Sequence, residues 1–315
     1  MAQPADRILQ TVPNVSEGRD AGIIRELAAA LASSGAQVAD VHIDADHHRS
    51  VFTTFGTATQ LRQSLVELAR ASRDALDISA HVGVHPRLGS LDVVPIVALD
   101  EILGVDDGGD AVDAHLLAVE VANDIGALGI PVVRYGDATD YPDTGSIRLL
   151  GTDGLVKRFA SGEIELAAGP GIPHLAAGIT LVGVRKVLVA FNVELDSGDL
   201  ALARGIAAVV RERGGGLPGV RALAFAMPSR HTVQVSTNIL RWSEAGPAEV
   251  LERVADLAAS QGIDVMSAEL VGLAPRDAMH DLGIACRRNH LRLRAAREPS
   301  LEVRARLARD RIARG

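Results

Sequence analysis

The sequence predicts an α+β fold built from two similar subdomains. In each half of the chain a short apolar strand precedes an amphipathic helix, a hairpin of two strands and a second helix. This order occupies residues 8–76 and returns at residues 184–262. A split β-α-β unit that occurs twice predicts two ferredoxin-like layers derived from an internal duplication. We expect mixed sheets that face each other, with the helices outside.

The first half has recognisable start and stop signals. Its expected elements are a strand at 8–12, a helix at 20–33, strands at 37–43 and 50–56, and a helix at 57–76. Asp20 can cap the first helix, because its carboxylate accepts hydrogen bonds from N–H groups of the first turn. Pro13 ends the first strand, since proline has no N–H for a ladder hydrogen bond.

The second half repeats these elements in the same order. They are a strand at 184–193, a helix at 199–213, strands at 220–227 and 232–240, and a helix at 247–262. Aligning residues 13–20 with residues 191–199 places Asn14 opposite Asn192. Aligning the hairpins without a gap places His48-Arg49 opposite Arg230-His231. Ligand sites often lie between such halves, so polar groups at the strand ends are candidates for binding.

The region between the halves is less regular. A helix at 111–127 and a strand at 132–135 precede a polar, turn-rich segment at 136–162. Residues 167–183 contain four glycines and two prolines, which would let the backbone approach a ligand closely. They do not match a nucleotide-binding fingerprint, and a plain linking loop is the alternative. The predicted domains are residues 1–182, residues 183–298 and a basic C-terminal helix or tail at 299–315.

Composition limits the classes of function. Hydrophobic residues make up 47% of the chain and charged residues 23%, as in folded globular proteins. Aromatic residues are only 3%, too few for platforms that stack nucleic-acid bases. One cysteine permits no internal disulfide, and no apolar run is long enough for a membrane helix. With no signal peptide in the sequence, we expect a cytoplasmic protein without a membrane partner.

The charge of the chain is unevenly distributed. Residues 287–315 hold ten arginines and three acidic residues, although the formal net charge of the whole chain is −8. A basic tail can bind nucleic acid. An amphipathic helix with solvated arginines is the simpler explanation, because Leu301, Ala305, Ala308 and Ile312 form one stripe. We therefore expect no nucleic-acid partner.

The stretch HVGVHPRLGSLDVVP at residues 81–95 carries the most concentrated chemistry. Pro86 disfavours the helical region for His85, which should be extended or in a turn. A histidine on irregular backbone beside a strand suits a general acid/base. The alternative is a loop histidine that caps a nearby carbonyl.

A metal-dependent hydrolase is a second possibility for the histidines and acids of this region. The potential ligands are His42, Asp44, Asp46, His47, His48, His81 and His85. No familiar ligand spacing fits the set, and Pro86 keeps His85 off a helix face shared with His81. The sequence therefore predicts no metal.

Six segments of the chain resemble glutamate formimidoyltransferase, the transferase half of formimidoyltransferase-cyclodeaminase. They are VPNVSEG (12–18), DADHHRSVFT (44–53), HPRLGSLDVVP (85–95), GVRKVLVAFNV (183–193), VSTNIL (235–240) and LVGLAP (270–275). The resemblance implies transfer of a formimidoyl group from N-formimidoyl-L-glutamate to N5 of tetrahydrofolate, the co-substrate, in histidine degradation. It also implies a homodimer.

The resemblance assigns roles to particular residues. His85 corresponds to the family's catalytic histidine, and Asp44 to its acid after the second strand. The folate-binding segment corresponds to Gly169–Gly178, with Gly169, Pro170, Gly171 and Gly178 as candidate contacts. Arg49 and Arg87 are the nearest candidates for the glutamate carboxylates, and Asn14 and Asn192 for further substrate contacts. A diverged folate protein that binds without catalysis, or acts on 5-formyltetrahydrofolate or another one-carbon donor, is the remaining alternative.

Overall fold

The computed structural model describes residues 7–104, 109–136 and 143–314. The chain forms two compact units. One comprises Met1–Lys186 with Ala305–Gly315, and the other comprises Val187–Arg304. Each unit contains a mixed β-sheet and its own helices, so the α+β class with two mixed sheets is confirmed.

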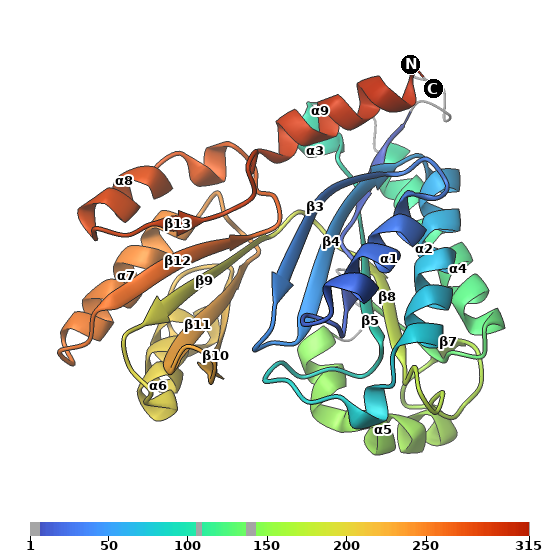
Figure 1. Ribbon diagram of the computed structural model, residues 1–315, viewed down its shortest axis with the longest axis horizontal. Coiled ribbons are helices and arrows are strands. Elements are labelled where there is room, and N and C mark those ends of the chain that lie inside the picture. Colours follow the sequence, from blue (N-terminus) through green and yellow to red (C-terminus); the bar gives the residue numbers. More distant parts are fainter. Residues whose placement is uncertain (1–6, 105–108, 137–142, 315) are drawn as a thin grey trace. The chain divides into compact units, whose positions relative to one another are not determined.

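The first unit is built on an eight-stranded sheet (Figure 1). Its strands are β1 (Leu9–Thr11), β2 (Asn14–Val15), β3 (Gln37–Asp44), β4 (Arg49–Gly56), β5 (Leu91–Val97), β6 (Val132–Gly136), β7 (Leu166–Ala168) and β8 (Thr180–Val184). β1 and β2 both pair with β4 and β5, so they follow one another along the same position in the sheet. The order is therefore β3-β4-β1/β2-β5-β8-β6-β7, with parallel pairs at β5–β8 and β8–β6.

Helices cover both faces of this sheet. They are α1 (Ala21–Ala32), α2 (Ala58–Ala75), η2 (Ile78–Ala80), α3 (Asp100–Leu103), α4 (Gly109–Ala127) and α5 (Thr144–Ser161). Side chains alternate along a strand, and β5 shows the result: Val94 joins the core under α1, α2 and α4, whereas Val93 joins the smaller core under α5. Asp20 accepts hydrogen bonds from Gly22 and Ile23, as expected for the cap of α1.

The second unit is built on a five-stranded sheet in the order β10-β11-β9-β12-β13. Its elements are β9 (Val189–Leu195), α6 (Leu200–Val210), η3 (Glu212–Gly214), β10 (Val220–Met227), β11 (Thr232–Ile239), α7 (Pro247–Ala259), β12 (Val265–Val271), η4 (Asp277–Met279), α8 (Leu282–Arg288) and β13 (Leu293–Arg294). α6 and α7 pack on Phe191, Val193 and their apolar neighbours in the sheet. The two units share one pairing pattern. The hairpin strands pair with each other, β3 with β4 and β10 with β11, and the second strand of each hairpin also pairs with the strand that precedes the first helix, β4 with β2 and β11 with β9.

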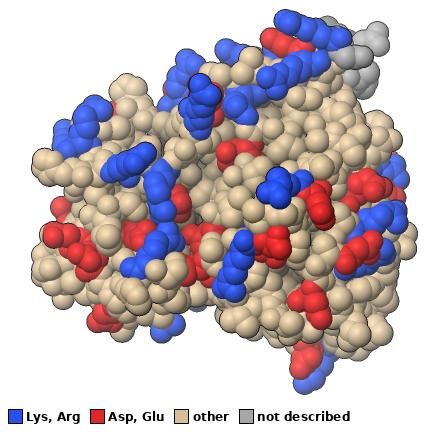
Figure 2. Space-filling model, viewed as in Figure 1, with Lys and Arg blue, Asp and Glu red and all other residues tan. Residues whose placement is uncertain are grey.

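The C-terminal segment forms α9 (Leu301–Ile312). Leu301, Ala305 and Ala308 are buried, as the apolar stripe predicts. Four arginines, Arg304, Arg306, Arg309 and Arg311, lie on the same helix, and basic side chains gather along it in Figure 2.

The alignment of the two hairpins was wrong by one residue. Each hairpin loop has four residues, and each ends in a histidine with a left-handed backbone, His48 at φ 49° and His231 at φ 56°. His48 is therefore equivalent to His231, and Arg49 to Thr232. Loop closure sets the register of a hairpin, and the residue types on either side of the loop did not reveal it.

The structure also corrects the middle of the chain. The segment interpreted as turn-rich contains α5, which Asp143 caps through Gly145 and Ser146. Gly151, at φ 63° and ψ 179°, interrupts the helix, and this break hid the periodicity from the sequence. The start of the segment, at 137–142, lies outside the described residues. The single strand predicted at 184–193 is two strands, β8 and β9.

Candidate active site

Two loops of the first unit meet at one edge of its sheet. Val15 of β2 pairs with Ser50 at the start of β4 on one side and with Leu91 at the start of β5 on the other. The β3–β4 loop and the loop before β5 therefore lie together. Val84 donates a backbone hydrogen bond to Asp46 across them (3.2 Å).

His85 is held by hydrogen bonds at both ring nitrogens. Arg49 Nη1 lies 2.9 Å from His85 Nε2, and His85 Nδ1 lies 2.7 Å from the carbonyl oxygen of Pro86. Guanidinium can only donate and a carbonyl can only accept, so Nε2 is the acceptor and Nδ1 carries the proton. Burial lowers the pKa of His85 well below its usual value, and the nearby charges of Arg49, Arg148 and His47 lower it further. The imidazole is therefore neutral at pH 7, the form that a base requires.

Arg87 ties the two loops to each other. Its Nε and Nη2 donate to the carbonyl of His85 (3.1 and 2.7 Å), and Nη2 also donates to that of His47 (2.9 Å). Its Nη1 donates to the carbonyl of His48 (3.3 Å) and contacts the ring of His81. Burial lowers the pKa of Arg87 to about 10, and it stays charged at neutral pH. Arg87 thus holds the backbones of the two loops together by hydrogen bonds.

His48 and His81 form a second imidazole pair. Their ring centroids are 4.0 Å apart, and His48 Nδ1 accepts the N–H of Gly18 (3.1 Å). Burial, followed by the charges of Arg87 and His48, lowers the pKa of His81 to about 4. Burial also lowers the pKa of His48, against the opposing charge of Glu17. Both rings are therefore neutral at pH 7.

A buried acid, Asp92, supports the loop that carries His85. Asp92 Oδ1 accepts the N–H of Leu88 (2.7 Å), and Asp92 Oδ2 is bonded by Arg148 Nη2. The side chains of Asp92 and Arg148 are 3% and 15% exposed. Arg148 comes from α5, in the segment that the sequence predicted to be turn-rich, and it was not among the predicted site residues. The cap at Asp143 could have indicated the helix, and the charge of Arg148 could have indicated a partner for a buried acid.

Asp44 and Asn14 lie in the same unit. Asp44 Oδ1 accepts the N–H of His47 (2.7 Å), which shapes the β3–β4 loop. Burial lowers the pKa of Arg49, and the negative charge of Asp44 acts in the opposite direction. Asn14 donates to the carbonyl of Val12 (2.9 Å) across the break between β1 and β2. Asn192 lies in the second unit, where it donates to Glu269 (3.2 Å).

The glycine-rich segment lies against the loop that carries His85. Gly178 forms a bridge with Gly89, and Ile179 donates to the carbonyl of Leu88 (2.9 Å). Gly178 has φ 69°, and a Cβ added there would lie 2.2 Å from Leu88 O. A side chain at this position would push away the loop that carries His85. Gly169 also has positive φ (82°), whereas Pro170 and Gly171 are exposed at the turn.

The site is poorly suited to a metal ion. Within the described residues, no group of three or more His, Cys, Asp or Glu side chains is arranged to hold one. Arginine N–H groups approach the rings of both His85 and His81. A cation bound there would meet positive charge.

Known proteins match nearly the whole chain. The model of the formiminotransferase domain, N-terminal subdomain, covers residues 8–185, and that of the formiminotransferase domain covers residues 190–296. The glutamate formimidoyltransferase of Streptococcus pyogenes serotype M1 is 31% identical over 281 residues, 88% of this chain and 92% of that protein. The chain belongs to the formiminotransferase family.

Two further formiminotransferase relatives show the extent of the match. The glutamate formimidoyltransferase of Thermoplasma acidophilum is 30% identical over 290 residues, 87% of this chain and 90% of that protein. The formimidoyltransferase-cyclodeaminase of Gallus gallus is 30% identical over 285 residues, 87% of this chain but 51% of that protein. The resemblance found in the sequence is thereby confirmed, and this formiminotransferase is a transferase enzyme.

The predicted site residues of the formiminotransferase fall into four groups. His85, Arg49, Arg87 and Asp44 lie at the two loops, and Gly178 forms a bridge with Gly89 of the loop that carries His85. Gly169, Pro170 and Gly171 lie at an exposed turn. Asn14 lies in the same unit on β2, and Asn192 lies in the other unit.

No helix among the described residues is long and apolar enough to cross a membrane.

Proposed function

We propose that this formiminotransferase is a cytoplasmic glutamate formimidoyltransferase. It would move the formimidoyl group from N-formimidoyl-L-glutamate to N5 of tetrahydrofolate, as a step of histidine degradation. The names of its relatives support formimidoyl transfer. The observation that carries the proposal is the neutral imidazole of His85 beside the arginines of β4 and α5. A base beside fixed cations suits a reaction between an amine and an anionic amidine.

The reaction requires two proton transfers at one place. N5 of tetrahydrofolate attacks the formimidoyl carbon, and the new C–N bond leaves N5 with a proton to lose. The bond between that carbon and the glutamate nitrogen then breaks, and this nitrogen must gain a proton. A single imidazole can accept the first proton and return it to the leaving nitrogen. We assign both transfers to His85.

The other residues bind and orient the substrates in this proposal. Arg49 binds a carboxylate of the donor, and Asp44 stabilises the amidinium or orients the imidazole. Residues Gly169–Gly178 approach the folate with their backbone. The contacts of Gly178 with Leu88 and Gly89, in the loop that carries His85, support this assignment. Asn14 and Asn192 serve as further substrate contacts. Arg87 is assigned to the loop, because its N–H groups already bond three backbone carbonyls.

A direct assay tests the proposal. The purified protein is mixed with tetrahydrofolate and N-formimidoyl-L-glutamate, and 5-formimidoyl-tetrahydrofolate is followed by its absorbance. Parallel reactions contain 5-formyltetrahydrofolate with glutamate in place of the formimidoyl donor. We expect turnover with the formimidoyl donor. Turnover with the formyl compound alone would instead support a diverged one-carbon enzyme, and binding of folate without turnover a non-catalytic binder.

We also propose that the protein is a homodimer, and that α4 forms its contact. Val112, Leu116 and Val119 are 60%, 61% and 42% exposed, and they repeat at intervals of four and three residues. Exposed Asn123 follows four residues later, and a single asparagine in such a row fixes its register. This is the spacing of a coiled-coil seam, and such a seam is complementary to a second copy of itself.

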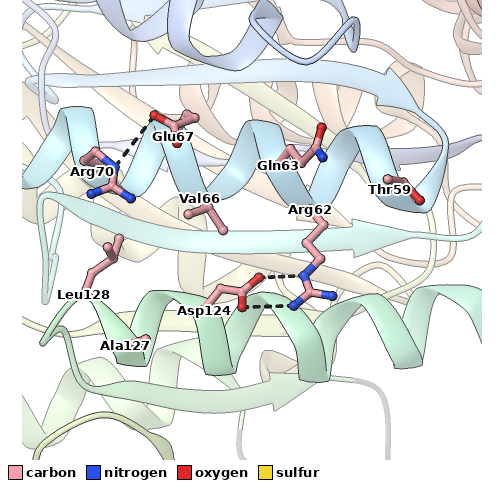
Figure 3. Close-up of a pocket in the computed structure, with 9 residues that line it drawn as sticks. All are labelled: Thr59, Arg62, Gln63, Val66, Glu67, Arg70, Asp124, Ala127 and Leu128. Carbon is pink, nitrogen blue, oxygen red and sulfur yellow. Dashed lines mark hydrogen bonds and ion pairs between the residues drawn. The ribbon is translucent and has the colours of Figure 1, made fainter.

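The surroundings of the α4 seam also suit a second copy. Next to it, α2 and α4 enclose a hollow of about 510 Å³ with Val66, Ala127 and Leu128 in its lining (Figure 3). The two acids beside the seam already have arginine partners, Asp113 with Arg7 (3.7 Å) and Glu120 with Arg62 (3.1 Å). Their charges are thus already offset within one chain, which lowers the repulsion between two copies.

Replacing Leu116 with glutamate should break this dimer. A charge at the centre of a seam loses its hydration without gaining a partner. We expect light scattering on a sizing column to show the mass of two chains for the wild type and of one chain for Leu116→Glu. The control is Leu307→Glu, a 48% exposed leucine on α9, which should remain a dimer. A monomeric wild type, or a dimeric Leu116→Glu, would refute the assignment.

We further infer that the two units are copies of one ancestral unit of the ferredoxin-like type. The shared strand order supports this, as do the aspartate caps at Asp20 and Asp199 and the left-handed histidines that end both hairpin loops.

A further inference from the structure

The hydrogen bond between Arg49 and His85 occupies the lone pair that a base must use. Nε2 of His85 accepts from Arg49, and Nδ1–H donates to Pro86. Neither ring nitrogen can therefore accept a proton from a substrate in this arrangement. A catalytic base in this position needs a mechanism that frees Nε2.

The charges around the site indicate what could free Nε2 of His85. Three arginines, Arg49, Arg87 and Arg148, interact with one another through their positive charges, and Asp44 and Asp92 oppose them. Arg148 is bonded to Asp92, and Arg87 to backbone carbonyls. Arg49, in contrast, donates to a neutral imidazole. A carboxylate carries a full negative charge and can accept two parallel hydrogen bonds from a guanidinium, whereas a neutral imidazole nitrogen accepts only one. An incoming carboxylate therefore competes well for Arg49.

We propose that Arg49 is a positioning residue with two alternative partners, Nε2 of His85 in the free enzyme and a carboxylate of the donor in the complex. This inference rests on the proposed transfer from a glutamate-derived amidine. Binding of the donor would release His85 as a base at the moment when its substrate arrives. Amidines without a carboxylate would leave Arg49 on His85 and react slowly. The site would thus select anionic donors by activating the base only for them.

The groups that face His85 give the direction of the accompanying pKa change. Arg49 approaches from β4, Arg148 from α5 and His47 from the β3–β4 loop, and each lowers the pKa of His85; only the bond to Pro86 raises it. A carboxylate bound to Arg49 removes one donor from Nε2 and offsets the positive charge. The pKa of His85 therefore rises on binding, towards the range useful at neutral pH.

The test is an NMR titration of the histidine Cε1–H signals of the full chain, with L-glutamate as the probe. The signal of His85 is identified by its absence from His85→Gln. In the free wild type it should remain that of a neutral ring at pH 6, and saturating L-glutamate should raise its pKa. In Arg49→Gln the pKa of the free protein should already be higher, and glutamate should not raise it further.

Controls separate this role from a merely structural one. Arg62→Gln removes an arginine of α2 that is bonded to Asp124 and Glu120 and has no contact with His85 among the described residues, and its His85 titration should match the wild type. Arg49→Lys covers the case in which Arg49→Gln does not fold; it keeps the charge but loses the fork, and it should give a weaker response to glutamate. The kcat/KM of Arg49→Gln should fall by about 10- to 100-fold, the factor expected for one charge-assisted hydrogen bond.

The outcomes are distinct from those of the activity assay. If glutamate shifts the pKa of His85 but no formimidoyl transfer occurs, the alternative partners of Arg49 stand and the proposed reaction is wrong. If the wild type transfers formimidoyl groups but glutamate leaves the pKa of His85 unchanged, Arg49 is a fixed anchor and the inference is overturned. Absence of any shift at saturating glutamate overturns it equally.

Discussion

His85→Ala is expected to lower kcat by about 10²- to 10⁴-fold, the usual contribution of a general acid/base. Both proton transfers of the proposed reaction depend on this imidazole. The fold should survive, because the loop is held by Arg87, Leu88 and Asp92 through bonds that do not use the ring. The measurements are kcat for formimidoyl transfer and a thermal melt of the variant.

The matched control for this variant is His115→Ala. His115 is exposed on α4, and its Nδ1 bonds only the preceding turn, at the carbonyl of Ala111 (2.7 Å). Its kcat should equal that of the wild type. If His85→Ala kept the wild-type kcat, another group would be the base. If instead kcat fell and folate binding were retained, the role would be in the transition state.

Asp92→Asn should give the second large effect, on stability and activity together. It leaves Arg148 without its carboxylate, and breaking a largely buried ion pair costs about 3–5 kcal/mol. It also weakens the acceptor for Leu88, so the loop that carries His85 loses its support. We expect a lower unfolding midpoint in urea for the first unit and a kcat reduced at temperatures where the protein is still folded.

A double-mutant cycle separates the effect of the Asp92–Arg148 ion pair from that of the hydrogen bond between Asp92 and Leu88. Arg148→Met removes the cation, and the combined variant should be less destabilised than the sum of the two single changes, because neither charge remains unpaired. Asp74→Asn is the control, since Asp74 pairs with Arg73 at the exposed surface (2.8 Å) and should have little effect. Additive effects of Asp92→Asn and Arg148→Met would show that the pair does not act as a unit.

Residue patterns led to the proposed site because its key element is local. Pro86 restricts the backbone of His85, and the motif around it ends at a buried strand, so His85 could be proposed as a functional histidine on a loop. The binding of a substrate carboxylate by Arg87 stays an untested prediction. Its charge and proximity in the sequence suggested a substrate partner, yet its N–H groups bond the carbonyls of His85, His47 and His48. Side-chain direction depends on the path of a second loop, which no local pattern encodes.

Most of the helices, the cap at Asp20 and the repeated order of strands and helices along the chain follow from the sequence alone, because each depends on residues within a few positions of one another. The tertiary structure alone decided which charges meet. Arg49 reaches His85 because β4 and β5 begin at the same edge of the sheet. Arg148 reaches Asp92 because α5 folds under the loop. Such contacts join residues 36 and 56 positions apart. Electrostatic energy depends on separation in space, so the protonation state of His85 is a property of the folded chain.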